Sequence, residues 1–244
     1  MAGSDGSVYA YGAGGFYGSL YGIRLAAPIV GIACGAACNG YWMVGSDGGL
    51  FAFGDSATYG SLSGIQLSAP IVGLAHTADF RGYWMVGSDG GVYAFGDAAF
   101  DGSLGGVHLS APIVGMASTA DGGGYWLVGS DGAVYAFGDA PFYGHPSLSN
   151  GVGVVSTPDG GGYWVYGSDG GVFAYGDAGF DGSLGGSALN EKVVAMVATA
   201  SGSPGYYMAA SDGSTFAWGS AFFIGSLSGT PLSAPVVGAA GGGG

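Results

Sequence analysis

Carboxylates recur at two fixed places in a repeated sequence pattern, where they could act as metal ligands. One set follows a glycine in segments of the "GDA" type: Asp55, Asp97, Asp139 and Asp177. The other set belongs to segments of the "TADGGG" type: Asp79, Asp121 and Asp159. Carboxylate and carbonyl oxygens suit Ca²⁺, so Asp55 with Asp79, or Asp97 with Asp121, could share this ion. The alternative is that these are solvated loops whose carboxylates accept backbone N–H groups.

Aromatic residues form two further columns of the same pattern. A tryptophan preceded by tyrosine recurs as Trp42, Trp84, Trp126 and Trp164, with Tyr207 in the fifth place. These rings either stack against sugars, one site per repeat, or pack between layers of the core. A second column differs between repeats: Tyr17, Tyr59, Asp101, Tyr143 and Asp181. We expect this varying column to face solvent and to contribute to a binding site.

The two cysteines occur in one repeat only. Cys34 and Cys38 lie in "ACGAACNG", which replaces a segment of the "ASTADGGG" type. In a tight loop their Cα atoms can come within about 7 Å, the separation that a disulfide needs. We expect a disulfide, as found in oxidising compartments, with free thiols as the alternative.

Catalytic groups do not form a recognisable set. The three histidines, His76, His108 and His145, occupy unlike places in the repeats, and Glu191 is the only glutamate. No serine has the surroundings of a nucleophile elbow with a credible base. We therefore expect a protein that is not an enzyme.

Composition limits the partners further. The chain has 244 residues, of which 48% are hydrophobic, and a formal net charge of −13. The three cations, Arg24, Arg81 and Lys192, cannot neutralise a phosphate backbone, which argues against nucleic acid as a ligand. Glycine and Ser-Asp-Gly interrupt every apolar stretch before the roughly 18 residues of a membrane span, so we expect no membrane insertion.

Six Ser-Asp-Gly turns mark an internal repeat. Their aspartates are 42, 42, 42, 38 and 43 residues apart: Asp5, Asp47, Asp89, Asp131, Asp169 and Asp212. About 42 residues is typical of a four-stranded propeller blade. Within one repeat we expect strands over 111–117, 124–129 and 134–138, and a brief outer strand in segments such as 16–20. The aspartates are expected to form turns.

The whole chain, 1–244, is therefore predicted to be one all-β domain, a six-bladed β-propeller. The terminal segments match the two parts of one blade, so we expect them to pair and close the ring. The predicted blades are 235–244 with 1–20, 27–62, 69–104, 111–148, 151–184 and 192–227.

The motif "GYWxVGSDGGVYAFGDAxFxGSL", followed by "LSAPIVGMA", resembles Gly-Tyr-Trp repeat regions of large secreted actinobacterial proteins. It is more loosely similar to tectonin-type lectin propellers, in its turns and aromatic pattern. The first resemblance implies export and a longer natural protein. The start "MAGSDGSVYAYG" has no basic or apolar leader, which fits either a cytoplasmic protein or a mature fragment. On the resemblance, we expect the mature extracellular fragment.

These observations favour a non-enzymatic secreted module that recognises carbohydrate at repeated sites. Ca²⁺ is the one cofactor expected. The alternative is a structural or protein-interaction scaffold whose partner is an extracellular protein. A lectin should expose aromatic rings at equivalent positions of the repeats, whereas a scaffold should bury them all.

Overall fold

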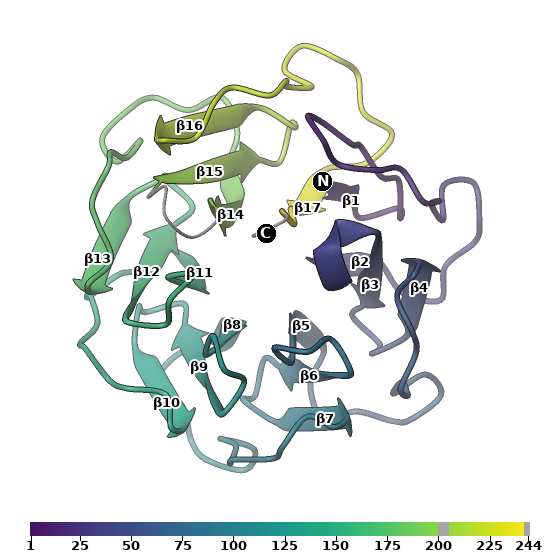
Figure 1. The fold of residues 1–244 in the computed structure, drawn as a ribbon, viewed down its shortest axis with the longest axis vertical. Coiled ribbons are helices and arrows are strands. Elements are labelled where there is room, and N and C mark those ends of the chain that lie inside the picture. The colour runs from purple at the N-terminus through teal and green to yellow at the C-terminus, as the bar shows by residue number, and fades with distance from the viewer. Residues whose placement is uncertain (200–204, 242–244) are drawn as a thin grey trace.

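The chain folds into repeated antiparallel sheets. This computed structural model describes residues 1–199 and 205–241 (Figure 1). Five three-stranded sheets follow one another along the chain: β2 (Ile29–Cys34), β3 (Gly40–Gly45) and β4 (Leu50–Gly54); β5 (Ile71–His76), β6 (Gly82–Gly87) and β7 (Val92–Gly96); β8 (Ile113–Ser118), β9 (Gly124–Gly129) and β10 (Val134–Gly138); β11 (Gly151–Ser156), β12 (Gly162–Gly167) and β13 (Val172–Gly176); β14 (Val193–Ala198), β15 (Gly205–Ala210) and β16 (Thr215–Gly219). The predicted all-β class is confirmed. In the described residues the one helical element is a short 3-10 turn, η1 (Ala36–Cys38).

The sheets stand around a common centre in chain order, each with its first strand innermost and its third outermost (Figure 1). A sixth, two-stranded sheet joins the two ends of the chain. Its strands are β1 (Ala2–Gly3) and β17 (Val236–Gly238), which pair antiparallel. The predicted pairing of the terminal segments is therefore confirmed. Parts of the first and sixth predicted blades, residues 242–244 and 200–204, lie outside the described residues.

The inner strands approach one another closely at a central glycine. A Cβ atom built on Gly115 of β8 would lie 3.3 Å from the Cα of Gly153 in β11. A side chain here would push the two strands apart, which is the crowding expected for innermost strands. The predicted bounds of the second and third strands, 124–129 and 134–138, match β9 and β10. The inner strand is β8, shifted two residues from the predicted start at Ala111.

The prediction of a fourth, outer strand is wrong. Segments such as 16–20 and 100–104 have no strand conformation. In the second of these, Gly102 has φ 134°, which leaves the extended region, and its Cβ position is 2.6 Å from Cδ1 of Phe137. Side chains of the same sheet and of the next one bind the backbone of these segments in place of a strand partner.

The Ser-Asp-Gly segments form tight turns between the second and third strands. Each aspartate accepts the backbone N–H two residues further on, as Asp89 does from Gly91 at 3.0 Å. The same bond is made by Asp5, Asp47, Asp131, Asp169 and Asp212. Their prediction as turn formers is confirmed.

The hydrophobic core lies between consecutive sheets. Tyr125 of β9 packs towards the preceding sheet with Trp84, whereas Trp126 packs towards the following one with Tyr163. In β10, Tyr135 packs towards the preceding sheet and Val134 towards the following one, because successive side chains of a strand point to opposite faces. In residues 1–199 and 205–241, no helix has the length and apolar character needed to cross a membrane.

Candidate functional site

The repeated tryptophans are buried between the sheets. Trp84 and Trp126 are 0% exposed, and Trp42 and Trp164 are 1% and 2% exposed. The Nε1 of Trp84 donates to the carbonyl of Ala99 at 2.6 Å, fifteen residues further along the chain. The other three make the same bond to Ala57, Pro141 and Gly179. Of the two predicted alternatives, the structure places these rings in the core, so they offer no free face for a sugar.

The tyrosine beside each tryptophan holds the outer chain of the preceding repeat. The hydroxyl of Tyr125 donates to the carbonyl of Gly102 at 2.6 Å and accepts the N–H of Asp101 at 3.2 Å. At the end of the same segment, the N–H of Leu104 donates to the carbonyl of Gly90. Residues 97–104 are thus fixed at three points. We call this stretch, and its equivalents in the other repeats, the outer segment.

A phenylalanine lies between the first two of these points and faces outwards. Phe100 follows the carbonyl bound by Trp84 and precedes the N–H bound by Tyr125, and it is 62% exposed. Equivalent phenylalanines are 57–68% exposed in four other repeats: Phe16, Phe142, Phe180 and Phe223. The remaining repeat, which contains β2 to β4, has an exposed threonine there, Thr58. We call this the wall position.

The wall position was not predicted, although the sequence carries a signal for it. The phenylalanine stands two residues before the glycine of the "GSL" segment in four repeats and before "GHP" in a fifth. The column beside it was expected to face solvent. Tyr17 and Tyr143 are 37% and 41% exposed, Asp101 and Asp181 are exposed, and Tyr59 is half-buried. Each wall phenylalanine except Phe223 is thus followed by a residue bearing a hydroxyl or a carboxylate.

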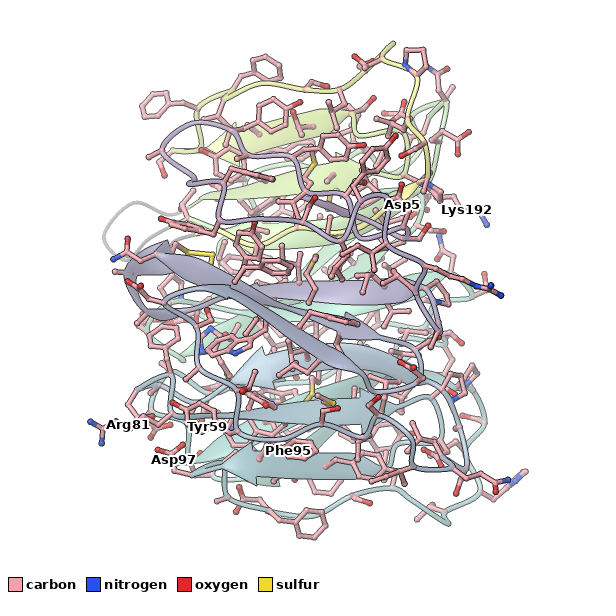
Figure 2. The ribbon with its side chains drawn as sticks, turned by 90° about the vertical axis from the view of Figure 1, so that its right-hand side faces the viewer. Asp5, Tyr59, Arg81, Phe95, Asp97 and Lys192 are labelled. Carbon is pink, nitrogen blue, oxygen red and sulfur yellow. A yellow bond between two sulfur atoms is a disulfide. The ribbon has the colours of Figure 1, made fainter. Side chains whose placement is uncertain are left out.

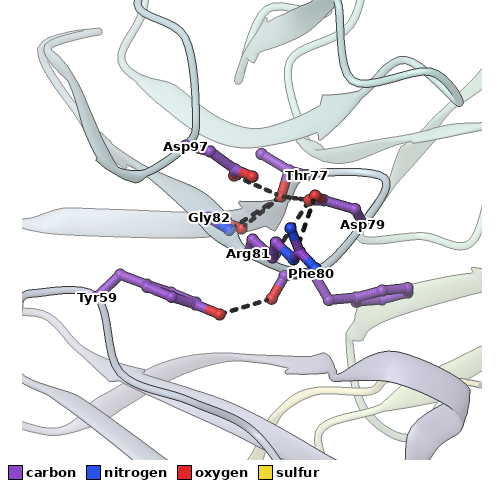
Figure 3. A network of polar contacts seen from close by, with 7 residues as sticks. All are labelled: Tyr59, Thr77, Asp79, Phe80, Arg81, Gly82 and Asp97. Carbon is purple, nitrogen blue, oxygen red and sulfur yellow. Dashed lines mark hydrogen bonds and ion pairs between the residues drawn. The ribbon is translucent and has the colours of Figure 1, made fainter.

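Threonines and carboxylates contact one another at one end of the sheets. Figure 2 shows Arg81 and Asp97 at this end, with Asp5 and Lys192 at the opposite one. The Oγ1 of Thr77 lies 3.0 Å from Oδ1 of Asp79 and 3.2 Å from Oδ1 of Asp97 (Figure 3). The same three positions recur in the next two repeats: Thr119 with Asp121 and Asp139, and Thr157 with Asp159 and Asp177. We call this end the acidic rim.

Aspartates of neighbouring repeats and of one repeat both come together at this rim. Asp139 and Asp159, in the two sequence places predicted to share an ion between neighbouring repeats, line one hollow. Within one repeat, Thr77 contacts both Asp79 and Asp97. The reason is the register of β6 and β7, which places Gly82 opposite Gly96. The loop that starts at residue 77 therefore folds over the end of the third strand of the same sheet.

Hydrogen bonds lower the pKa of several rim carboxyls. The Thr119 hydroxyl and then the Gly123 N–H hold the pKa of Asp121 below its usual value. Thr157 and Gly161 act in the same way on Asp159. For Asp79, the N–H of Arg81 is the first cause. The Arg81–Asp79 ion pair, 3.8 Å long and exposed, contributes little.

Ca²⁺ binding remains a prediction for this rim. Asp121, Asp139 and Asp159 line one shallow hollow of about 220 Å³. Within 1–199 and 205–241, however, no three His, Cys, Asp or Glu side chains are grouped closely enough to hold a metal ion. Asp55 has no threonine beside it, because Gly35 occupies that place in its repeat.

Cys34 and Cys38 form a disulfide with their Cα atoms 5.1 Å apart, at the start and end of the loop that holds η1. Gly35 here replaces the rim threonine, and Ser56 replaces the alanine found at 98 and 140. A Cβ on Gly35 would lie 2.4 Å from the Oγ of Ser56. The glycine and the serine therefore fit each other, and this loop carries neither Thr nor Asp of the acidic rim.

The histidines are separate, as their sequence positions indicate. His76 stacks on Phe80 at 4.5 Å, and burial lowers its pKa. His145 lies against the carbonyl of Pro146, on another outer segment.

Comparison with known proteins adds no relative: no family model matches the chain, and the search of curated proteins finds no match.

Proposed function

We propose that this chain is a non-enzymatic carbohydrate-binding module with repeated sites on its outer wall. The observation that carries the proposal is the wall position, where five of six repeats expose a phenylalanine at one equivalent place. Exposed aromatics at equivalent positions are the feature that distinguishes a lectin from a scaffold.

The fold does not require these phenylalanines. Thr58 occupies the wall position of one repeat, and its outer segment is bound as in the others, by Trp42, Tyr83 and the turn at Gly48. An exposed phenylalanine gains little for stability, because its ring stays largely in water. Five such rings in equivalent places therefore support a role in binding.

The surroundings of the ring suit a sugar. The apolar face of a pyranose can stack on phenylalanine, while the neighbouring Tyr17, Tyr143, Asp101 or Asp181 can exchange hydrogen bonds with its hydroxyls. Each site is shallow and weak by itself. Repetition around the ring raises the avidity for a branched or repeating glycan.

We further infer that the six sheet units are blades of one closed β-propeller, with blade bounds as predicted from the repeat. The circular order of the sheets and the pairing of β1 with β17 support this inference. Export to an oxidising compartment is proposed on the disulfide and on the resemblance of the repeat. The native partners would then be extracellular glycans.

A glycan array tests the proposal, run once with Ca²⁺ and once with EDTA. We expect binding to a defined class of sugar. Loss with EDTA would add Ca²⁺ at the acidic rim, whereas binding under both conditions would limit the site to the wall. A blank array in both conditions contradicts the proposal.

The second candidate is a structural or protein-interaction scaffold of a larger secreted protein. The observation in its favour is that the repeated Tyr-Trp pairs are wholly used in holding the outer segments. Capture of a defined extracellular protein, together with a blank glycan array, would establish it.

A further inference from the structure

A hollow of about 420 Å³ opens beside the fifth three-stranded sheet. It is lined by Thr215 and Phe216 of β16, by the segment 188–191 and by Phe223 of the outer segment. The hollow thus joins one wall position, Phe223, to the Ser-Asp-Gly turn of Asp212. Phe223 is 68% exposed, and Phe216 is half-buried against Trp218, with ring centroids 6.1 Å apart.

Polar residues replace apolar or small ones around this hollow. Glu191, the one glutamate of the chain, stands where other repeats have Ala27, Ala69, Ala111 and Ala234. Thr215 stands where they have Leu50, Val92, Val134 and Val172. Thr215 has a structural role, because its Oγ1 donates to the carbonyl of Gly225 at 2.6 Å, a bond that a tyrosine hydroxyl makes in the other repeats. Four other repeats fold with alanine in the place of Glu191, so the fold does not account for this glutamate.

The carboxylates of the hollow are held by short-range hydrogen bonds. Ser211 Oγ donates to Oε2 of Glu191 at 3.0 Å. Asp212 accepts the N–H of Ser214 on Oδ1 and its hydroxyl on Oδ2, both at 2.8 Å. An ionised carboxylate has about four acceptor sites, so both groups keep capacity for the hydroxyls of a ligand.

The charge of the lining selects among sugars. Glu191 and Asp212 line the hollow, and none of its twelve lining residues is basic. Uronic or sialic acids would bring a carboxylate against these two and be repelled. A neutral sugar instead offers hydroxyl donors to the carboxylates and an apolar face to Phe223.

We propose that this hollow is a dedicated site for one neutral pyranose, stronger than the other wall positions. Phe223 and Phe216 provide the aromatic surface, and Glu191 and Asp212 accept the hydroxyls. The inference rests on the proposed function, because it assumes that the wall position binds sugar. It adds a class of ligand and a preferred site.

Titration calorimetry with the whole chain tests it, using the methyl glycosides of glucose, galactose and mannose, with glucuronic acid as the anionic probe. We expect one neutral glycoside to bind at one site per chain, and glucuronic acid at least tenfold more weakly. Glu191→Ala should weaken the neutral glycoside at least tenfold. This substitution restores the alanine of four other repeats, so the variant should fold normally.

Phe100→Thr is the matched control, because it removes a wall phenylalanine from a repeat that has Ala111 in the place of Glu191. This variant should bind the glycoside as the unaltered chain does. No binding of any of the three glycosides, or equal binding by Glu191→Ala, overturns the inference. Glycan-array binding by the unaltered chain, together with either of these results, would leave the proposed function standing without this site, whereas a blank array would remove both.

Discussion

The outer segment places two kinds of residue side by side. The backbone at Ala99 and Gly102 is bound by Trp84 and Tyr125, which are buried and recur in nearly every repeat. Between them, Phe100 has its ring in solvent. The difference teaches that the most repeated motif, Gly-Tyr-Trp, serves the architecture, and that a binding role is better sought at the exposed residue that the motif holds in place.

The two ends of the ring differ in the same sense. At one end, six Ser-Asp-Gly turns are built alike, each aspartate bound to its own turn. At the other, the Thr-Asp-Asp arrangement occurs in three consecutive repeats and a disulfide loop replaces it in another. The acidic rim is therefore a place where the fold allows several solutions.

The largest effect on stability should come from the buried indole. Trp126→Ala removes a fully buried ring and its hydrogen bond to the carbonyl of Pro141. We expect a loss of about 3–5 kcal/mol in the free energy of unfolding, measured by urea denaturation. Trp126→Phe keeps most of the packing and should lose less. A loss below about 1 kcal/mol for the alanine variant would show that the indole does not hold the outer segment.

The tyrosine hydroxyl should matter less than the indole. Tyr125→Phe keeps the ring but leaves the carbonyl of Gly102 and the N–H of Asp101 without their partner. We expect a loss of about 1–3 kcal/mol, because unsatisfied polar groups are costly where water is excluded. Tyr135→Phe, for which no hydroxyl partner is described here, serves as the control. Equal stability of the Tyr125→Phe and unaltered chains would contradict the clamp.

Removal of the disulfide should have a similar or smaller effect. Replacing Cys34 and Cys38 by serine removes the bond that closes this loop, whose two ends are four residues apart in the sequence. Loop-closure entropy for so short a ring predicts a loss of about 2 kcal/mol. The measurement compares the free energy of unfolding of the oxidised chain with that of the double variant. If the double variant were unfolded throughout, the disulfide would be needed for the whole fold, which would contradict this expectation.

Acid should weaken the hydrogen bonds of the acidic rim. The folded pKa values of Asp79, Asp121 and Asp159 are lowered, so their stabilisation is present above the unfolded pKa near 4. As the pH falls through that range, the unfolded chain binds protons first and the stabilisation is lost. We expect a falling unfolding temperature between pH 5 and pH 3.

Thr119→Val tests the cause of this acid sensitivity, because it removes the hydroxyl that lowers the pKa of Asp121. The variant should show a smaller drop over the same pH interval. An unchanged drop would assign the acid sensitivity to other carboxyls, such as Asp5.

The repeat period predicted the all-β class, the bounds of β9 and β10 and the pairing of the chain ends, because each depends on local pattern or on matching termini. The outer segments were mispredicted as strands. The conformation of these segments includes glycines with positive φ, such as Gly102, and depends on side chains such as Tyr125 of the neighbouring sheet. The contact of both Asp79 and Asp97 with Thr77 likewise depends on strand register. The exposure of Phe100 depends on the bonds that Trp84 and Tyr125 make to the residues on either side of it.

The central claim is that the wall position binds ligand and does not serve stability. It is tested most directly by replacing the wall phenylalanines with threonine, the residue found at position 58: Phe16, Phe100, Phe142, Phe180 and Phe223. Urea denaturation and the glycan array are then measured on the same variant. The account predicts a free energy of unfolding within about 0.5 kcal/mol per substitution and loss of glycan binding. Retained binding, or unfolding of the variant, would contradict it.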